Sequence, residues 1–431
     1  MTTIFYETFP VAHLTFEGEW RLDYHPSWEA RRSAFPVSLT MPLRSGPVAA
    51  DRLLPWLANL LPETHLAEIG QRLKVSPQDI VGLLGHIGRD TAGALSIGAP
   101  RKPGIYLQPV PDAEVLERIL DELPAKPFLV GERGVSMSLA GVQEKLPVFV
   151  DEDGTISIPV DGTPSTHILK PDTKRLAGSV ENEAFCIALA RACRLEAAEA
   201  TVGIAGKRRY LLVKRYDRFT DVQGEIRRLH QEDLFQLTGH FPSQKYECSS
   251  TGRGATLKMM FGAVSDLVSP AERRKLLDAI IFNVLICNSD SHAKNYSVLI
   301  GAGGSAKMAP LYDLMCAAVY HQVDQSLPQG IAGRFNATEL RKADWQALAD
   351  ELGLSGTSTV RRVKSLRSVS APRAMRWCCK SRIWLAIQQG CWRRLSTQSK
   401  SGVGVCRRYV VGEESRTRSE IISALRRHSG H

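Results

Sequence analysis

Residues 288–295 read Asn-Ser-Asp-Ser-His-Ala-Lys-Asn and lie between a predicted helix over 270–287 and a strand-like run over 296–300. Asp290 lies five residues before Asn295 in this stretch. Phosphoryl transfer needs a carboxylate that receives the proton of the nucleophile and oxygen ligands for Mg²⁺, and a kinase loop with this Asp-to-Asn spacing supplies both. The stretch therefore predicts a loop for phosphoryl transfer at the end of a buried helix.

A second carboxylate occurs in Ala309-Pro-Leu-Tyr-Asp313, after a short strand, a glycine-rich turn and a strand-like run. Mg²⁺ prefers such oxygen ligands and completes its shell with water and phosphate. Asp290 alone could be an ordinary polar loop residue, and Asp313 alone could be a cap. Taken together with Asn295, the two carboxylates are expected around the end of one buried helix. A magnesium site is then as good an interpretation as these two ordinary roles.

The upstream half offers groups that could hold the phosphates of a nucleotide. Residues 136–145 (SMSLAGVQEK) form a turn of small residues whose backbone N–H groups could wrap phosphates, although the turn is not a Walker A motif. Lys170 ends an apolar strand and could neutralise phosphates if a carboxylate on the next helix holds it. Glu183 is the first candidate for that carboxylate and Glu181 the second. The alternative is that Lys170 is a strand-end residue that reaches solvent.

The pattern of apolar residues predicts a two-lobed body with a cleft between a β-rich half and a helical half. Strands are expected before Asp217, and after it we expect strands to stop and helices to take over. The predicted strands cover 146–150, 166–170 and 209–213, with a hairpin turn over 151–154, and the predicted helices cover 113–123, 181–195, 231–237, 255–267 and 270–287.

The first 100 residues are predicted to be a small α+β unit with no chemistry of its own. Alternation over 36–41 predicts a strand. Helical spacing over 51–61 predicts a helix with Pro55 in its first turn, and Ser76-Pro77 has the composition of a helix start.

Composition excludes several classes of protein. The chain has 431 residues, of which 43% are hydrophobic and 23% charged, as in globular proteins. No stretch is apolar enough to span a membrane, and the N-terminus lacks the pattern of a secretory signal, so we expect a cytoplasmic protein. The nine cysteines include no CxxC pair and no ligand spacing for a metal, which disfavours a zinc or redox site.

Seven short stretches in the central part of the chain, given below, resemble motifs of the HipA family and occur in the same order. Members of this family are serine/threonine-protein kinase toxins of bacterial type II toxin–antitoxin modules. Two N-terminal stretches, NLLPE (59–63) and LLGHIGRDTAGAL (83–95), resemble the same family. The resemblance covers roughly residues 5–360. The seven blocks are SLAGVQEK (138–145), THILKP (166–171), ENEAFCIALA (181–190), VKRYDRF (213–219), RLHQEDLFQLTG (228–239), NSDSHAKN (288–295) and PLYD (310–313).

The resemblance implies a protein-kinase-like α+β fold and a role for each candidate residue. Asp290 would be the catalytic base, Lys170 would bind the phosphates of ATP and Glu183 would hold that lysine. Asn295 and Asp313 would bind Mg²⁺. The implied cofactors are therefore ATP and Mg²⁺.

The resemblance further implies that the kinase phosphorylates its own Ser138, which ejects the phosphate-covering loop and switches the enzyme off. A dianionic group cannot stay in a pocket built for ATP phosphates beside carboxylates. Residues 214–216 would be the hinge that holds adenine through backbone groups, and Lys214 departs from the glutamate that is common there. The implied nucleotide-binding residues are Ala140, Gly141, Val142, Gln143, Glu144, Lys145, Lys170, Lys214, Arg215, Tyr216, His292, Lys294 and Tyr312.

Partners and substrate follow from the resemblance alone. It implies a HipB-like helix-turn-helix antitoxin, operator DNA contacted mainly through that antitoxin, and an aminoacyl-tRNA synthetase of the glutamate–tRNA ligase type as the protein substrate. Growth arrest and drug tolerance would follow. Two other hypotheses remain: a catalytically dead kinase-like module that binds antitoxin and operator DNA, and a small-molecule kinase, which the seven blocks disfavour.

The expected domains are an N-terminal subdomain over 1–110, a β-rich nucleotide-binding lobe over 111–216, a helical catalytic lobe over 217–365 and an atypical basic tail over 366–431. Residues 361–431 contain 17 Lys and Arg and three acids, whereas the first 360 contain 38 and 42, so the tail carries the net positive charge. A frameshift, a basic arm that touches operator phosphates and an ordinary basic last helix are the alternatives. A frameshift predicts an acid-containing amphipathic continuation in another reading frame after about codon 365.

Overall fold

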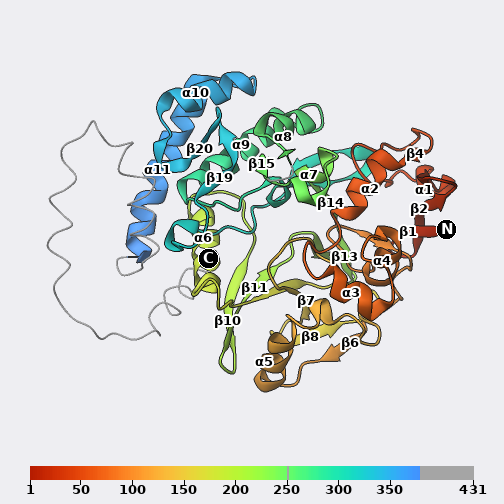
Figure 1. Ribbon diagram of the computed structural model, residues 1–431. Coiled ribbons are helices and arrows are strands. Elements are labelled where there is room, and N and C mark those ends of the chain that lie inside the picture. Colours follow the sequence, from red (N-terminus) through yellow and green to blue (C-terminus); the bar gives the residue numbers. More distant parts are fainter. Residues whose placement is uncertain (250–251, 379–431) are drawn as a thin grey trace.

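The computed structural model describes residues 1–249 and 252–378, and Figure 1 shows three regions of the chain gathered around one another. The first region is a five-stranded antiparallel sheet with the strand order β4-β3-β2-β1-β5 and four helices. Its strands are β1 (Thr2–Tyr6), β2 (Phe9–Phe16), β3 (Trp20–Tyr24), β4 (Val48–Ala49) and β5 (Leu95–Ile97), and its helices are α1 (Pro26–Glu29), α2 (Ala50–Ala58), α3 (Leu66–Leu73) and α4 (Ile80–Ile87).

The strand predicted over 36–41 is wrong, because this segment is a turn with one isolated bridge between Ser38 and Met41. Its backbone bonds to the side chains of residues 230 and 232 and not to a neighbouring strand. The backbone N–H of Leu39 donates to Glu232 Oε1 at 2.7 Å, and the carbonyl of Val37 lies 2.8 Å from the ring nitrogen Nε2 of His230.

Two helix details in this region also differ from the prediction. The helix expected to start at Ser76-Pro77 starts instead at Ile80, because Asp79 accepts a hydrogen bond from the backbone N–H of Gly82 at 2.8 Å and caps α4. Pro55 lies in the second turn of α2, because that helix already begins at Ala50.

The second region is a six-stranded sheet with the order β10-β11-β9-β7-β8-β6, in which all neighbours are antiparallel. The predicted strands over 146–150, 166–170 and 209–213 all lie in this sheet. Its strands are β6 (Leu107–Pro109), β7 (Leu146–Val150), β8 (Ile156–Pro159), β9 (His167–Pro171), β10 (Ala200–Ala205) and β11 (Arg208–Lys214), and its helices are α5 (Ala113–Glu122) and α6 (Ser179–Ala192).

The third region contains helices, as expected, but the expectation that strands stop after Asp217 is wrong. Residues 231–233 of the predicted helix over 231–237 belong instead to a strand over 230–233 that pairs with residues 297–300, and only a four-residue helix follows. The helices are α7 (Leu234–Leu237), α8 (Leu257–Val264), α9 (Pro270–Leu285), α10 (Lys342–Glu351) and α11 (Gly356–Cys378), and the strands are β12 (Arg218–Thr220), β13 (Ile226–Arg228), β14 (His230–Asp233), β15 (Cys248–Ser249), β16 (Gly252–Arg253), β17 (Ser297–Ile300), β18 (Ala306–Met308), β19 (Ser326–Ile331) and β20 (Arg334–Asn336).

Helix α9 explains where the loop over 288–295 lies. Ser269 caps the helix and Pro270 occupies its first position, so its start is well defined. From Leu276 to Leu285 nearly every residue is buried, as expected for a helix that is apolar on all sides. The loop that follows is therefore anchored to the core.

The hydrophobic core is continuous from β1 to α11. Among the residues that the structure describes, no helix combines the length and apolar character that are needed to cross a membrane. The predicted tail over 366–431 lies largely outside those residues, since they end in α11. This helix packs against α6, α9 and α10.

Candidate active site

The loop after α9 is held by the amide of Asn288, a buried residue. Its Nδ2 donates to Asn283 Oδ1 at 2.9 Å and to the carbonyl of Asp313 at 3.2 Å, while its Oδ1 accepts from the backbone N–H of Asp290 at 3.2 Å. Asn295 Nδ2 donates to the carbonyl of Asp290 at 2.7 Å. The structure thus brings Asp290, Asn295 and Asp313 together, and Asn288 is a site residue to which the sequence analysis gave no role.

Lys170 at the end of β9 makes one buried and one partly buried ion pair. Its Nζ lies 2.7 Å from Glu183 Oε1 on α6 and 2.7 Å from Asp313 Oδ1. Burial lowers the pKa of Lys170, but the two carboxylates outweigh burial and raise it above its ordinary value. Glu181, the second candidate for holding this lysine, instead pairs with Arg209. The carboxylate that holds Lys170 is therefore Glu183.

Asp313 has a backbone φ of 56°, which is unfavourable for a residue with a side chain. Residues in such conformations persist only where their surroundings hold them, and here Asn288 bonds the carbonyl of Asp313. Burial raises the pKa of Asp313, but Lys170 and Lys145 outweigh burial and hold it well below its usual range. Asp313 is therefore an ionised carboxylate whose backbone is held in place.

The donor set of Asp313 and Asn295 fits Mg²⁺ only together with a nucleotide. Within residues 1–249 and 252–378 no group of three His, Cys, Asp or Glu side chains could hold a metal by itself. One carboxylate and one amide leave most of an octahedral shell to water and phosphate oxygens, which is the arrangement that Mg²⁺ adopts at nucleotide sites.

In the predicted phosphate-covering loop over 140–145, the last residue contacts the first. Lys145 Nζ donates to the carbonyl of Ala140 at 2.6 Å, and Gly141 has a φ of 113° that a residue with a side chain rarely adopts. Burial and Lys170 lower the pKa of Lys145 to about 8, although Asp313 opposes them. Ser138 is fully buried, and its hydroxyl donates to the carbonyl of Leu60 at 2.7 Å. Val142, Gln143 and Glu144 line a small pocket beside this loop.

Several polar groups of the predicted hinge over 214–216 are hydrogen-bonded to other parts of the protein. The backbone N–H groups of Lys214 and Arg215 donate to the carbonyls of Glu199 and Thr166, at 2.8 and 2.9 Å. The Arg215 side chain is buried in an ion-pair cluster. The backbone N–H groups of Lys214 and Arg215 are therefore already bonded within the protein.

Tyr312 contacts the loop over 288–295 and the strand that follows it. Its hydroxyl donates to the carbonyl of Lys294 at 2.7 Å and lies 2.6 Å from Ser297 Oγ. The rings of Tyr216 and Tyr312 are 5.7 Å apart. Tyr312 thus connects the hinge to the loop.

Tyr246, Glu63 and Lys245 are polar residues at this site to which the sequence analysis gave no role. Tyr246 donates its phenol hydrogen to Asp290 Oδ1 at 2.5 Å, and its ring lies edge-on to His292. Glu63 of the N-terminal region pairs with Lys245 and with Lys294 of the catalytic loop. Burial lowers the pKa of His292 to about 4, so this imidazole is neutral near pH 7. No motif spacing pointed to these contacts, because they join distant loops.

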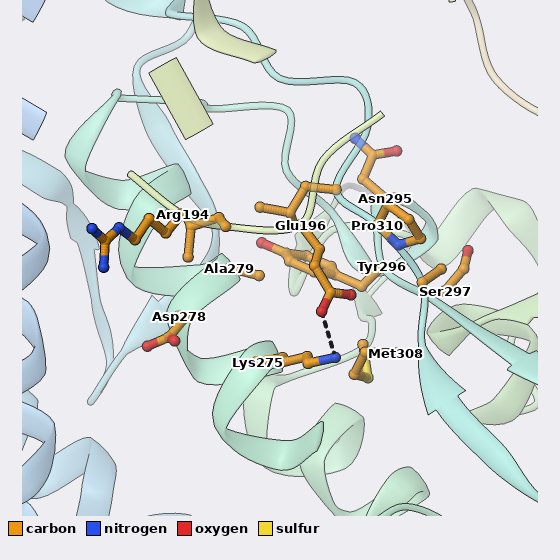
Figure 2. Close-up of a pocket in the computed structure, with 13 residues that line it drawn as sticks. Arg194, Glu196, Lys275, Asp278, Ala279, Asn295, Tyr296, Ser297, Met308 and Pro310 are labelled. Carbon is orange, nitrogen blue, oxygen red and sulfur yellow. Dashed lines mark ion pairs between the residues drawn. The ribbon is translucent and has the colours of Figure 1, made fainter. Parts of the chain in front are cut away.

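Figure 2 shows a pocket that is lined by residues of α9, by Asn295 and by residues that follow it. Lys275 on α9 and Glu196 both line this pocket and form an ion pair at 2.8 Å. Of the predicted site residues only Asn295 lines this pocket. It is therefore separate from the Lys170–Glu183–Asp313 cluster.

The variant Glu183→Gln is expected to lower kcat about 10²-fold, because Lys170 keeps only Asp313 as an anionic partner and moves from its place. The control is Glu181→Gln on the same helix, which loses only the pair with Arg209 and is expected to keep the parent activity. Steady-state kinetics with ATP and an acceptor protein measure the effect. Equal rates for the two variants would contradict the assignment of Glu183.

Comparisons with known proteins find two family models in this chain. The HipA N-terminal domain matches residues 2–98, and the HipA-like C-terminal domain matches residues 137–373. Y4mE of Sinorhizobium fredii is 37% identical over 369 residues, which cover 83% of this chain and 87% of that protein.

The serine/threonine-protein kinase toxin HipA of Shewanella oneidensis is 31% identical over 368 residues, which cover 80% of this chain and 81% of that protein. A solved structure of the Shewanella oneidensis MR-1 HipA, in complex with HipB and operator DNA, superimposes with a TM-score of 0.75 at 26% identity. It covers 90% of this chain and 97% of that chain.

Proposed function

The chain belongs to the HipA family of serine/threonine kinase toxins, and from this membership we propose that it is an Mg·ATP-dependent protein kinase that acts as the toxin of a toxin–antitoxin module. One observation carries the proposal. The ion pairs of Lys170 with Glu183 and Asp313 are connected to the loop of Asp290 and Asn295 through a single amide, that of Asn288.

We assign each group a part in the transfer. Lys170 and the loop over 140–145 would bind the phosphates, and Asp290 would accept the proton of the acceptor hydroxyl. Asn295 and Asp313 would hold Mg²⁺, which when bound neutralises charge on the phosphates. The neutral imidazole of His292 adds no charge beside the base.

For partners, the support is the fit to a HipA that was solved with HipB and operator DNA. We propose a HipB-like antitoxin for this chain, with operator DNA contacted mainly through it. An aminoacyl-tRNA synthetase of the glutamate–tRNA ligase type is the proposed protein substrate. A module without catalysis is less well supported, because the candidate base, lysine and metal ligands are all present and connected.

Incubation of the protein with radiolabelled ATP and Mg²⁺ is expected to label Ser138, and the variant Asp313→Asn is expected to abolish labelling because it removes a metal ligand. Since the Ser138 hydroxyl is buried against Leu60, labelling requires the loop to leave its place. Mass spectrometry of the labelled peptide identifies the site. The same assay with purified aminoacyl-tRNA synthetases tests the substrate.

Ser138→Ala is the control for that experiment, because it should lose self-labelling and keep transfer to a protein substrate. A folded protein that binds no ATP would contradict the proposed function.

A further inference from the structure

A carboxylate from the N-terminal region reaches the catalytic loop. Glu63 lies between α2 and α3, and its side chain is 9% exposed. Its Oε2 lies 2.8 Å from Lys245 Nζ and its Oε1 lies 3.1 Å from Lys294 Nζ, and the side chains of these lysines are 11% and 3% exposed. Three charges from three distant segments thus form one buried triad, which we call the Glu63 triad.

Glu63 is the one carboxylate that pairs with the two lysines among the described residues. Burial raises the pKa of Glu63, but Lys294 and Lys245 outweigh burial and lower it to about 2, so the carboxylate is ionised at neutral pH. Neither lysine has another ion-pair partner within 4 Å among the described residues. Without Glu63, both ammonium groups would remain buried without a counter-charge, which is unfavourable.

Both lysines of the triad are connected to Asp290 through the chain or through a neighbouring residue. Lys294 lies four residues after Asp290, within the same loop. Lys245 is the neighbour of Tyr246, whose phenol donates to Asp290 Oδ1 at 2.5 Å. The segment is fixed on its far side as well, because Glu247 Oε2 accepts a hydrogen bond from the backbone N–H of Gly330 at 2.8 Å. Glu63 is therefore connected to Asp290 by two routes.

We propose that Glu63 is a positioning residue for the phosphoryl transfer, which holds the loop of Asp290 through Lys294 and the phenol of Tyr246 through Lys245. This inference rests on the proposed kinase function. It makes the N-terminal region part of the active site, although that region was expected to have no chemistry of its own. Misplacing a catalytic group by about 1 Å can cost about 10²-fold in rate.

The test compares Glu63→Gln with Glu68→Gln, a control on α3 in the same region whose exposed carboxylate lies 3.9 Å from His65. The Glu63→Gln protein is expected to lose about 10- to 100-fold in kcat with less than about a threefold change in the KM for ATP. Glu68→Gln is expected to match the parent protein. Thermal unfolding of each variant shows whether it is folded under the assay conditions.

Tyr246→Phe and the double variant Glu63→Gln/Tyr246→Phe separate positioning from a purely structural role. Because Tyr246 lies on one of the two routes, its loss should lower kcat, and the two losses should combine to less than their product. If Glu63→Gln does not fold, Glu63→Asp replaces it, since the shorter side chain keeps the charge but cannot reach both lysines and should lower kcat.

Two outcomes would overturn the inference: a parent-like kcat for a folded Glu63 variant, or losses for Glu63 and Tyr246 that multiply independently. A parent protein that transfers no phosphate would instead contradict the proposed function. Since the parent is assayed in parallel, the two failures are distinguishable.

Discussion

The variant Asp290→Asn is expected to lower kcat for phosphoryl transfer about 10³-fold, the size of effect that general base catalysis supplies. Asparagine keeps the shape of the side chain, and the backbone contacts of residue 290 to Asn288 and Asn295 do not involve it. The loop should therefore keep its conformation and lose only the proton acceptor. Single-turnover kinetics with saturating ATP measure the chemical step.

Nucleotide affinity should be nearly unchanged in this variant, because Lys170, Glu183 and Asp313 are untouched. Asp266→Asn, an exposed change outside the site, is the matched control and should have the parent rate. If Asp290→Asn keeps more than about a tenth of the parent rate, Asp290 is not the base.

The structure resolves a choice that the sequence left open at Lys170. The helical spacing placed Glu181 and Glu183 on one helix but could not say which of them faces β9. In the structure Arg209 on β11 forms an ion pair with Glu181, and Lys170 forms an ion pair with Glu183. The partner of Glu181 was not foreseeable, because strand register is a tertiary property.

Contacts between distant segments account for most of what was missed. The loop over 288–295 could be singled out in the sequence because its polar groups lie within eight residues, whereas Glu63 meets Lys245 and Lys294 only through the docking of two regions. The error at residues 230–233 has a related cause. His230 and Glu232 are polar but buried, because they bond to residues 37–39 of the N-terminal region, so their strand lacked an apolar face.

A second interface between the same regions is a cluster of buried charges beside the hinge. Asp217 accepts hydrogen bonds from Arg215 Nε and Nη2 at 2.9 and 2.7 Å, and its Oδ2 lies 2.9 Å from Arg218 Nη1. Asp217 Oδ2 also accepts from the backbone N–H of Gly93 at 2.8 Å. Arg218 continues to Asp90 at 2.9 Å. These side chains are at most 3% exposed, so each charge depends on its partners.

The variant Asp217→Asn is expected to lower the free energy of unfolding at pH 7 by about 3–5 kcal/mol, because it leaves the buried Arg215 and Arg218 to share the single carboxylate of Asp90. Urea denaturation measures the loss. Asp121→Asn is the control: Asp121 pairs with Arg208 at the surface and its side chain is 61% exposed, so its loss should cost less than about 1 kcal/mol. Equal losses in the two variants would show that the cluster contributes no more than a surface pair.

The same cluster predicts how stability depends on pH. Burial raises the pKa of Asp217, but Arg215 and Arg218 outweigh burial and hold the pKa well below its ordinary value of 3.8. The unfolded chain therefore binds a proton at Asp217 before the folded chain does, and the stabilisation is fully present above that ordinary value and lost as the pH falls below it. Since asparagine does not titrate, the difference in stability between parent and Asp217→Asn should be constant from pH 7 to about pH 5 and shrink below about pH 4. A difference that stays constant down to pH 2 would mean that Asp217 has an ordinary pKa and that the arginines contribute nothing to its ionisation.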